Sequence, residues 1–359
     1  MNTTTQTHND GFLHEGFNRK KALNVFQTTR DAYLAEVQKA AKNQCIGKNN
    51  WPQINEISAW MMSAETATFM KWGGLGMVAS ELPESFNATF GKHNHHISII
   101  TPMYIGNTGK KCASFDGKTY CGAEGRSVAA EKVITLKVPF ISTRKNLTVY
   151  NVAVYKASFN NVNYMFLHNE HFFSINPHKT NPSAQDGCYV LNEHGVNEVE
   201  RFAFFSKAVY MLLKECVSSV KSALPCPNIL IANDWHSGAL AGLCKYSSIM
   251  EVRDKSMTEE VAARIQNTPI IHIAHHLGYQ GWDYPNTAKI LNSLYEHNAQ
   301  AVFKNAKAIK NSNPRTPNTL IVYDCYNQAS GSFHLADRVV TVSKNYMEEV
   351  SKELGFGLD

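Results

Sequence analysis

The sequence is poor in charged residues and in long apolar runs. Lys, Arg, Asp and Glu make up 18% of the 359 residues, and the formal net charge of +5 is spread along the chain without a dense Lys/Arg run. We therefore expect no nucleic acid partner. No apolar stretch approaches the roughly 18 residues that a membrane helix requires, so we expect no membrane span either.

Signals of secretion and of disulfide formation are also missing. The first residues, MNTTTQTHNDGFLHEGFNRKK, lack the apolar core of a secretory signal. The eight cysteines include no C-x-x-C pair, and a chain with 43% hydrophobic residues can bury a core without disulfide bonds. We expect reduced thiols and a cytoplasmic location.

Common ligand-binding motifs are absent too. The sequence contains no G-x-x-x-x-G-K-S/T loop, no G-x-G-x-x-G loop and no H-E-x-x-H helix. His275 and His276 are adjacent, but no carboxylate is spaced to complete a zinc ligand set with them. We therefore expect neither a metal ion nor a cofactor.

What the sequence does contain is a repeated order of strand, polar loop and helix. Short apolar runs indicate the strands, and apolar residues that recur every three or four positions indicate the helices. The expected strands lie within 54–65, 95–104, 132–140, 147–159, 162–169, 228–233, 268–274 and 336–342, and the longest helices within 73–92 and 197–220. This order predicts an α/β fold with a parallel, Rossmann-like sheet.

The chain divides into a polar N-terminal extension, residues 1–52, and one large domain, residues 53–359. Inside the domain, residues 105–131 are rich in Gly, Lys, Ser and Cys and are expected to form a loop or a small hairpin. Residues 169–195 form a second long polar loop. A loop of that length in a compact domain is usually functional or mobile.

Four polar loops follow expected strands or precede expected helices, at 71–76, 233–237, 275–281 and 343–345. Ligands of open α/β sheets bind in the loops at the carboxyl ends of the strands. In the first loop, KWGGLG, the glycines allow close approach of a ligand, and Lys71 and a helix N-terminus favour an anion. The same residues also suit a plain strand-to-helix turn, and the pattern alone favours neither interpretation.

The second and third loops carry groups that could bind hydroxyls. Asp234, Trp235 and His236 adjoin at the end of a buried strand, where a Trp can serve as a sugar platform and a His can donate to or accept from a hydroxyl. The alternative is that Asp234 caps the next helix and Trp235 fills the core. His275 and His276 are open to the same two interpretations, ligand binding or structural burial.

Five segments together resemble a known family. KWGGLGMVASELP, ERFAFFSKA, NDWHSGALAGL, HIAHHLGYQG and ADRVVTVSKNYMEEV are similar to motifs of the glycogen and starch synthases of glycosyltransferase family five, and they follow the family's order. The resemblance implies the GT-B fold, in which two Rossmann-like domains face a cleft. It covers the N-terminal catalytic domain only, and no E-P-C-G-like motif of the C-terminal domain occurs, so that domain is expected to be missing from this chain.

The resemblance implies a reaction and its partners. Glucose would move from ADP-glucose, or UDP-glucose, to the non-reducing end of an α-1,4-glucan, with retention and without a metal ion. Lys71 and the amides of Gly73 and Gly74 would contact the diphosphate and the transferred glucose. His275 would lie beside the donor glucose, so that Lys71 and His275 are the expected catalytic residues.

The remaining implied contacts are to the sugars. Asp234, Trp235 and His236 would line the acceptor or donor side, and Tyr279 and Gln280 would shape the same rim. Two other functions compete with glucan synthesis: a non-catalytic glucan-binding or regulatory half-domain, and a GT-B transferase of different sugar specificity.

The chain departs from the family pattern at polar positions. Met77 replaces an Asp, His276 replaces an Asn, and HGVNEVERF, with Gly195 to Glu198, replaces a segment that carries a Tyr and an Asp. Asn233 in place of His is a milder change. Each departure alters a group expected to face sugar, so the fold is more strongly indicated than the activity.

Overall fold

The computed structural model describes residues 56–142, 146–185, 187–219, 224–253, 255–283, 285–296, 321–322, 325–343 and 346–347. The expected N-terminal extension, residues 1–52, therefore lies outside the described residues. Of the fourth loop, 343–345, only Ser343 is described.

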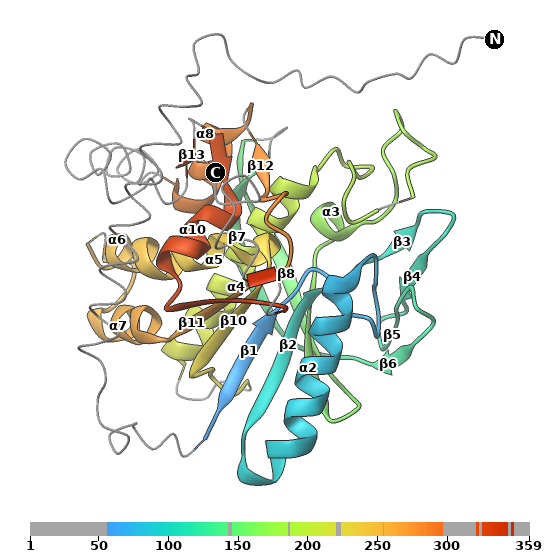
Figure 1. The fold of residues 1–359 in the computed structure, drawn as a ribbon. Coiled ribbons are helices and arrows are strands. Elements are labelled where there is room, and N and C mark those ends of the chain that lie inside the picture. The colour runs from blue at the N-terminus through green and yellow to red at the C-terminus, as the bar shows by residue number, and fades with distance from the viewer. Residues whose placement is uncertain are drawn as a thin grey trace. The chain divides into compact units, whose positions relative to one another are not determined.

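An eight-stranded sheet organises the described chain, in the order β15-β11-β10-β1-β2-β9-β8-β7 (Figure 1). The first six strands run parallel to one another, and β8 is antiparallel to both β9 and β7. The strands are β1 Ser58–Met62, β2 His96–Pro102, β7 Glu131–Ile141, β8 Leu147–Phe159, β9 Val162–His168, β10 Ile229–Asn233, β11 Ile270–Ala274 and β15 Arg338–Thr341. The expectation of a mainly parallel α/β sheet is confirmed.

Helices cover both faces of this sheet because successive side chains of a strand point to opposite sides. Ala59 and Met61 of β1 pack in a small cluster with Ala79 of helix α2, Gly74–Phe90. Trp60 and Met62, which point the other way, belong to the main core. That core also contains the apolar side chains of helix α4, Glu198–Ser218. Asn197 caps the start of this helix, because its side chain accepts a hydrogen bond from Glu200 N.

Shorter helical elements complete the described fold. They are α3 Glu170–Phe173, α5 Ala239–Gly242, α6 Ser248–Arg253, α7 Glu259–Asn267, α8 Thr287–Tyr295 and α10 Gln328–Leu335, with a π-helical stretch at Leu243–Ser247 and 3-10 turns at Gly91–His93 and Trp235–Ser237. A three-stranded sheet of β12 Trp282–Asp283, β14 Cys325–Asn327 and β13 Ile321–Val322 lies beside α8 and α10. Among the described residues, no helix combines the length and apolar character that crossing a membrane would need.

Residues 105–131 are more regular than the expected loop or small hairpin. They form a four-stranded antiparallel sheet of β3 Gly106–Asn107, β4 Cys112–Phe115, β5 Thr119–Cys121 and β6 Ser127–Ala129. Strands of two to four residues are too short to show a readable alternation of apolar and polar positions, so the sequence pattern could not reveal them.

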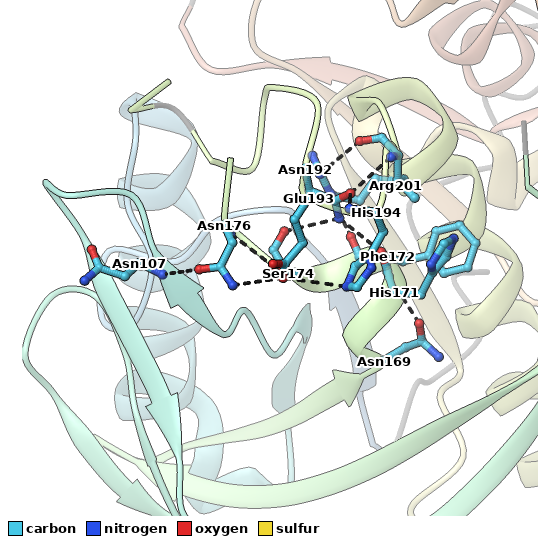
Figure 2. A network of polar contacts seen from close by, with 11 residues as sticks. Asn107, Asn169, His171, Phe172, Ser174, Asn176, Asn192, Glu193, His194 and Arg201 are labelled. Carbon is cyan, nitrogen blue, oxygen red and sulfur yellow. Dashed lines mark hydrogen bonds and ion pairs between the residues drawn. The ribbon is translucent and has the colours of Figure 1, made fainter. Parts of the chain in front are cut away.

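Residues 169–195 form a long loop, as expected, with only the short helix α3 in its described part. Figure 2 shows the polar network that orders it. Glu193 Oε1 accepts from Ser174 Oγ at 2.7 Å and from Asn176 Nδ2 at 2.9 Å. Asn107 N, in β3, donates to Asn176 Oδ1 at 2.8 Å. The loop is thereby joined to the small sheet.

Arg201 of α4 holds the same loop through hydrogen bonds to its backbone (Figure 2). Its guanidinium is fully buried and donates to the backbone carbonyls of Phe172, Cys188, Val190 and Val196, at 2.6–3.4 Å. Two of these carbonyls flank Tyr189 in sequence. The helix therefore fixes the position of Tyr189, which contributes to the site described next.

Candidate functional site

A cavity of about 680 Å³ lies where the parallel strands end. It is lined by Gly73, Gly74, Leu75, Val78, Tyr189, Glu198, Asp234, Trp235, His236, His275, His276, Tyr279 and Val342. The first three expected loops thus meet in one place, and the fourth adjoins it through Val342. Lys71 and Gln280 are expected site residues that do not line the cavity.

The glycine loop is held by a residue that sequence reasoning missed. Glu65, 2% exposed, lies just beyond β1, and its Oε2 accepts from the backbone amides of Trp72 at 2.6 Å and Gly73 at 2.8 Å. Its Oε1 accepts from the hydroxyl of Tyr189. The resemblance assigns the amide of Gly73 to the donor substrate, but in this structure the amide donates its hydrogen bond to Glu65.

Lys71 and Gln280 make other contacts. The backbone amide of Lys71 donates to Glu124 Oε1 at 3.0 Å. Gln280 is 4% exposed; its Nε2 donates to Leu277 O at 2.9 Å, and its Oε1 accepts from Asn327 Nδ2 at 2.7 Å. Gln280 therefore braces the loop that carries Tyr279, and the catalytic role of Lys71 stays a prediction.

Asp234 has a conformation that is rare outside glycine, with φ 62° and ψ −177°. Such a backbone costs about 1–3 kcal/mol and is found mostly at functional sites. Its side chain does not cap the following turn, against one of the two interpretations of the sequence. Burial raises the pKa of the Asp234 carboxyl to about 7, although the backbone amides of Trp235, His275 and His276 favour its charged form.

Trp235 and His236 are packed as a stacked pair. Their ring centroids are 4.0 Å apart at an angle of 29°, and both side chains are under 5% exposed. Trp235 also packs edge-on against Phe202, so it fills the core as well as lining the cavity. The exposed ring at the rim belongs to Tyr279, which is 39% exposed.

His236 is the least satisfied polar group of the cavity. Neither Nδ1 nor Nε2 has a hydrogen-bond partner among the described residues. Burial lowers the pKa of the imidazole well below its ordinary value, so the ring is neutral. A neutral imidazole has one donor and one acceptor, and an unmade buried hydrogen bond costs about 1–3 kcal/mol.

His275 and Glu198 have protein partners. His275 Nε2 lies 2.7 Å from Asn233 Oδ1, and burial lowers the pKa of this imidazole to about 4. Glu198, within the segment that departs from the family pattern, accepts from the hydroxyl of Tyr279, and burial raises the pKa of its carboxyl. Glu198 was not among the expected site residues, although it lies in the segment, Gly195 to Glu198, where a change facing sugar was expected.

The lining is suited to hydroxyl groups. Among the described residues it offers carboxyl, imidazole and phenol groups, and it contains no Lys or Arg. Within the same part of the chain, no group of three or more His, Cys, Asp or Glu side chains is arranged to hold a metal ion.

Comparisons with known proteins identify relatives of this chain. The glycogen synthase of Finegoldia magna is 26% identical over 304 residues, covering 83% of this chain and 48% of the relative. That of Lachnospira eligens is 26% identical over 295 residues, covering 81% and 46%. The chain thus spans about half the length of the curated relatives it matches.

The fold has a solved counterpart. The structure titled as the catalytic domain of starch synthase IV from Arabidopsis thaliana bound to ADP and acarbose matches with a TM-score of 0.52 at 20% identity, covering 82% of this chain and 46% of that one. The family model described as the starch synthase catalytic domain matches residues 59–359. The chain therefore belongs to the glycogen/starch synthase family of glycosyltransferases, which has the GT-B fold.

Proposed function

We propose that this cavity is the sugar-binding half of a glucosyltransferase site. Glucose moves from ADP-glucose or UDP-glucose to the non-reducing end of an α-1,4-glucan, with retention at the anomeric carbon. The observation that carries the proposal is His236, which lines the cavity, is 97% buried, and has no partner for either ring nitrogen among the described residues. A sugar hydroxyl, which both donates and accepts, is the group that satisfies such a ring.

The neighbouring groups support the same ligand. Glu198 and Asp234 offer carboxyl oxygens to further hydroxyls, and Tyr279 offers an exposed ring on which a sugar can pack. The relatives are named glycogen synthases, and the starch synthase IV structure is titled as bound to ADP and acarbose. In this proposal Lys71 and the glycine loop of Gly73 and Gly74, at the start of α2, approach the diphosphate, and His275 contacts the donor glucose.

Glucosyl transfer tests the proposal directly. The full-length gene product is incubated with labelled ADP-glucose or UDP-glucose and glycogen, and label in the polymer is measured before and after digestion with an α-1,4-specific amylase. We expect digestible label from at least one donor, and a loss of more than tenfold in kcat/KM in His236→Ala. Absence of label with both donors contradicts the proposal.

One observation favours a second candidate, a glucan-binding module without transfer. The described lining contains no Lys or Arg, the side chains that would stabilise a leaving diphosphate. Calorimetry with maltoheptaose separates the candidates, because this module binds the saccharide but produces no labelled polymer. A transferase of other sugar specificity would instead turn over a different nucleotide sugar.

A further inference from the structure

A chain of hydrogen bonds lies behind His275. Ser63 Oγ donates to the backbone carbonyl of Glu65 at 2.7 Å. Asn233 Nδ2 donates to Ser63 Oγ at 3.0 Å, and Asn233 Oδ1 lies 2.7 Å from His275 Nε2. Ser63 and Asn233 are both fully buried, so no solvent competes for these bonds.

The first member of the chain fixes the direction of every bond in it. A carbonyl oxygen can only accept, so the single hydroxyl proton of Ser63 points to Glu65 O. The oxygen of Ser63 must then accept, which places the NH2 group of Asn233 toward Ser63 and its Oδ1 toward His275. Because an amide oxygen only accepts, His275 Nε2 must carry a proton.

The neutral form of His275 follows from its surroundings. Burial lowers the pKa of the ring to about 4, and a positive charge on His275 would also lie close enough to His236 and His272 to lower their pKa values. A neutral ring with its proton on Nε2 has a lone pair on Nδ1. No described residue donates to that nitrogen.

We propose that Asn233 is a positioning residue that holds His275 as the Nε2–H tautomer, so that Nδ1 accepts a hydrogen bond from a ligand hydroxyl. A phosphate oxygen, which also only accepts, is rejected at the same nitrogen. The identity of the ligand, a glucose unit, rests on the proposed function. The tautomer depends only on the series of hydrogen bonds that runs from the Glu65 carbonyl through Ser63 and Asn233 to His275.

Nitrogen NMR of the full chain labelled with ¹⁵N-histidine tests the tautomer without any activity. Long-range ¹H–¹⁵N spectra distinguish Nε2–H from Nδ1–H, and His275→Gln identifies the signals. We expect His275 as Nε2–H at pH 7, a mixture of tautomers in Asn233→Leu and in Ser63→Ala, and protonation at higher pH in Asn233→Asp. Since Asn233 is buried, Ser63→Ala covers the case in which Asn233→Leu does not fold.

The matched control is Asn228→Ala. Asn228 precedes the same strand, and its amide bonds Ser58 N and Glu56 O away from His275, so its variant keeps the wild-type tautomer. An Nδ1–H signal in the wild type, or an unchanged signal in a folded Ser63→Ala or Asn233→Leu variant, overturns the proposal.

Ligand titration tests the second half of the inference. We expect maltose or ADP-glucose to move the Nδ1 signal of His275 and inorganic pyrophosphate to leave it unchanged. A shift with pyrophosphate alone, or with none of these probes, overturns the assignment of a hydroxyl. If the sugar moves the signal but no glucosyl transfer occurs, the proposed transferase activity fails while the positioning role of Asn233 stands.

Discussion

The carboxyl group of Glu65 accepts the backbone amide of Gly73 at 2.8 Å, at the residue that precedes helix α2. A helix N-terminus attracts anions because its first amides lack partners inside the helix. Here Glu65, just beyond β1, accepts hydrogen bonds from the two amides that precede the helix, so the glycine loop is already ordered before a ligand binds.

Replacing Glu65 tests this ordering role. Glu65→Gln keeps the shape but puts an NH2 group among three donors, the amides of Trp72 and Gly73 and the Tyr189 hydroxyl. We expect the free energy of unfolding to fall by about 1–3 kcal/mol, measured by urea denaturation. Glu81→Gln, on the exposed surface of α2, is the control and should change stability by less than about 0.5 kcal/mol.

Substituting Gly74 tests whether the space beside it is needed for ligand binding without disturbing the fold. A Cβ at Gly74 would meet nothing within 4 Å, and the residue lines the cavity. Gly74→Ala should therefore fold with equal or slightly higher stability, since alanine loses less backbone entropy, yet bind maltoheptaose at least several-fold more weakly.

Gly281 provides the contrasting variant for that experiment. Its φ is +71°, and a Cβ there would lie 2.4 Å from Cε3 of Trp235. Gly281→Ala should lower the midpoint of thermal unfolding, because the free energy of unfolding should fall by more than about 1 kcal/mol. Equal maltoheptaose affinity in Gly74→Ala and the wild type would show that the open space at Gly74 is not used by the ligand.

The raised pKa of Asp234 predicts a pH-dependent stability. The folded protein holds the carboxyl proton up to about pH 7, whereas the ordinary value is 3.8. The stabilising contribution of this proton is complete below about pH 4 and is lost as the pH rises through 7. Urea midpoints between pH 5 and 8 should therefore fall less steeply in Asp234→Asn than in the wild type.

Asparagine is suitable at position 234 because it has nearly the shape of aspartate but carries no titratable carboxyl group. Asp116→Asn is the control. The Asp116 carboxyl is fully exposed, and backbone hydrogen bonds from Thr119 and Lys118 lower its pKa, so its titration lies below the measured range. A wild-type slope in Asp234→Asn would contradict the assignment.

Arg201 should control the order of the long loop. Arg201→Lys keeps the charge but replaces a planar group that reaches four carbonyls by a single ammonium. We expect faster amide hydrogen exchange around Cys188 to Val190, together with a loss of stability of a few kcal/mol. Unchanged exchange in that segment would mean that the network around Glu193 orders the loop alone.

The sequence predicted the parts of the molecule that depend on local pattern. Buried parallel strands are continuous apolar runs, so their ends, and with them the loops of Gly73, Asp234 and His275, could be located. Glu65 and Tyr189 could not be paired, because 124 positions separate them and no local pattern records the contact. The sequence also does not show where a side chain in a loop points. Lys71 and Gln280 were therefore expected in the site, but they do not line the cavity.

The backbone of Asp234 has a consequence for anyone who redesigns this protein. A design procedure that minimises backbone conformational energy alone would choose glycine at this position, which has a φ of 62° and an extended ψ. That change would relieve about 1–3 kcal/mol of strain and remove a cavity carboxyl at the same time. Thermostability screens scored without substrate are thus expected to enrich Asp234→Gly, which trades the chemistry of the site for a more robust scaffold.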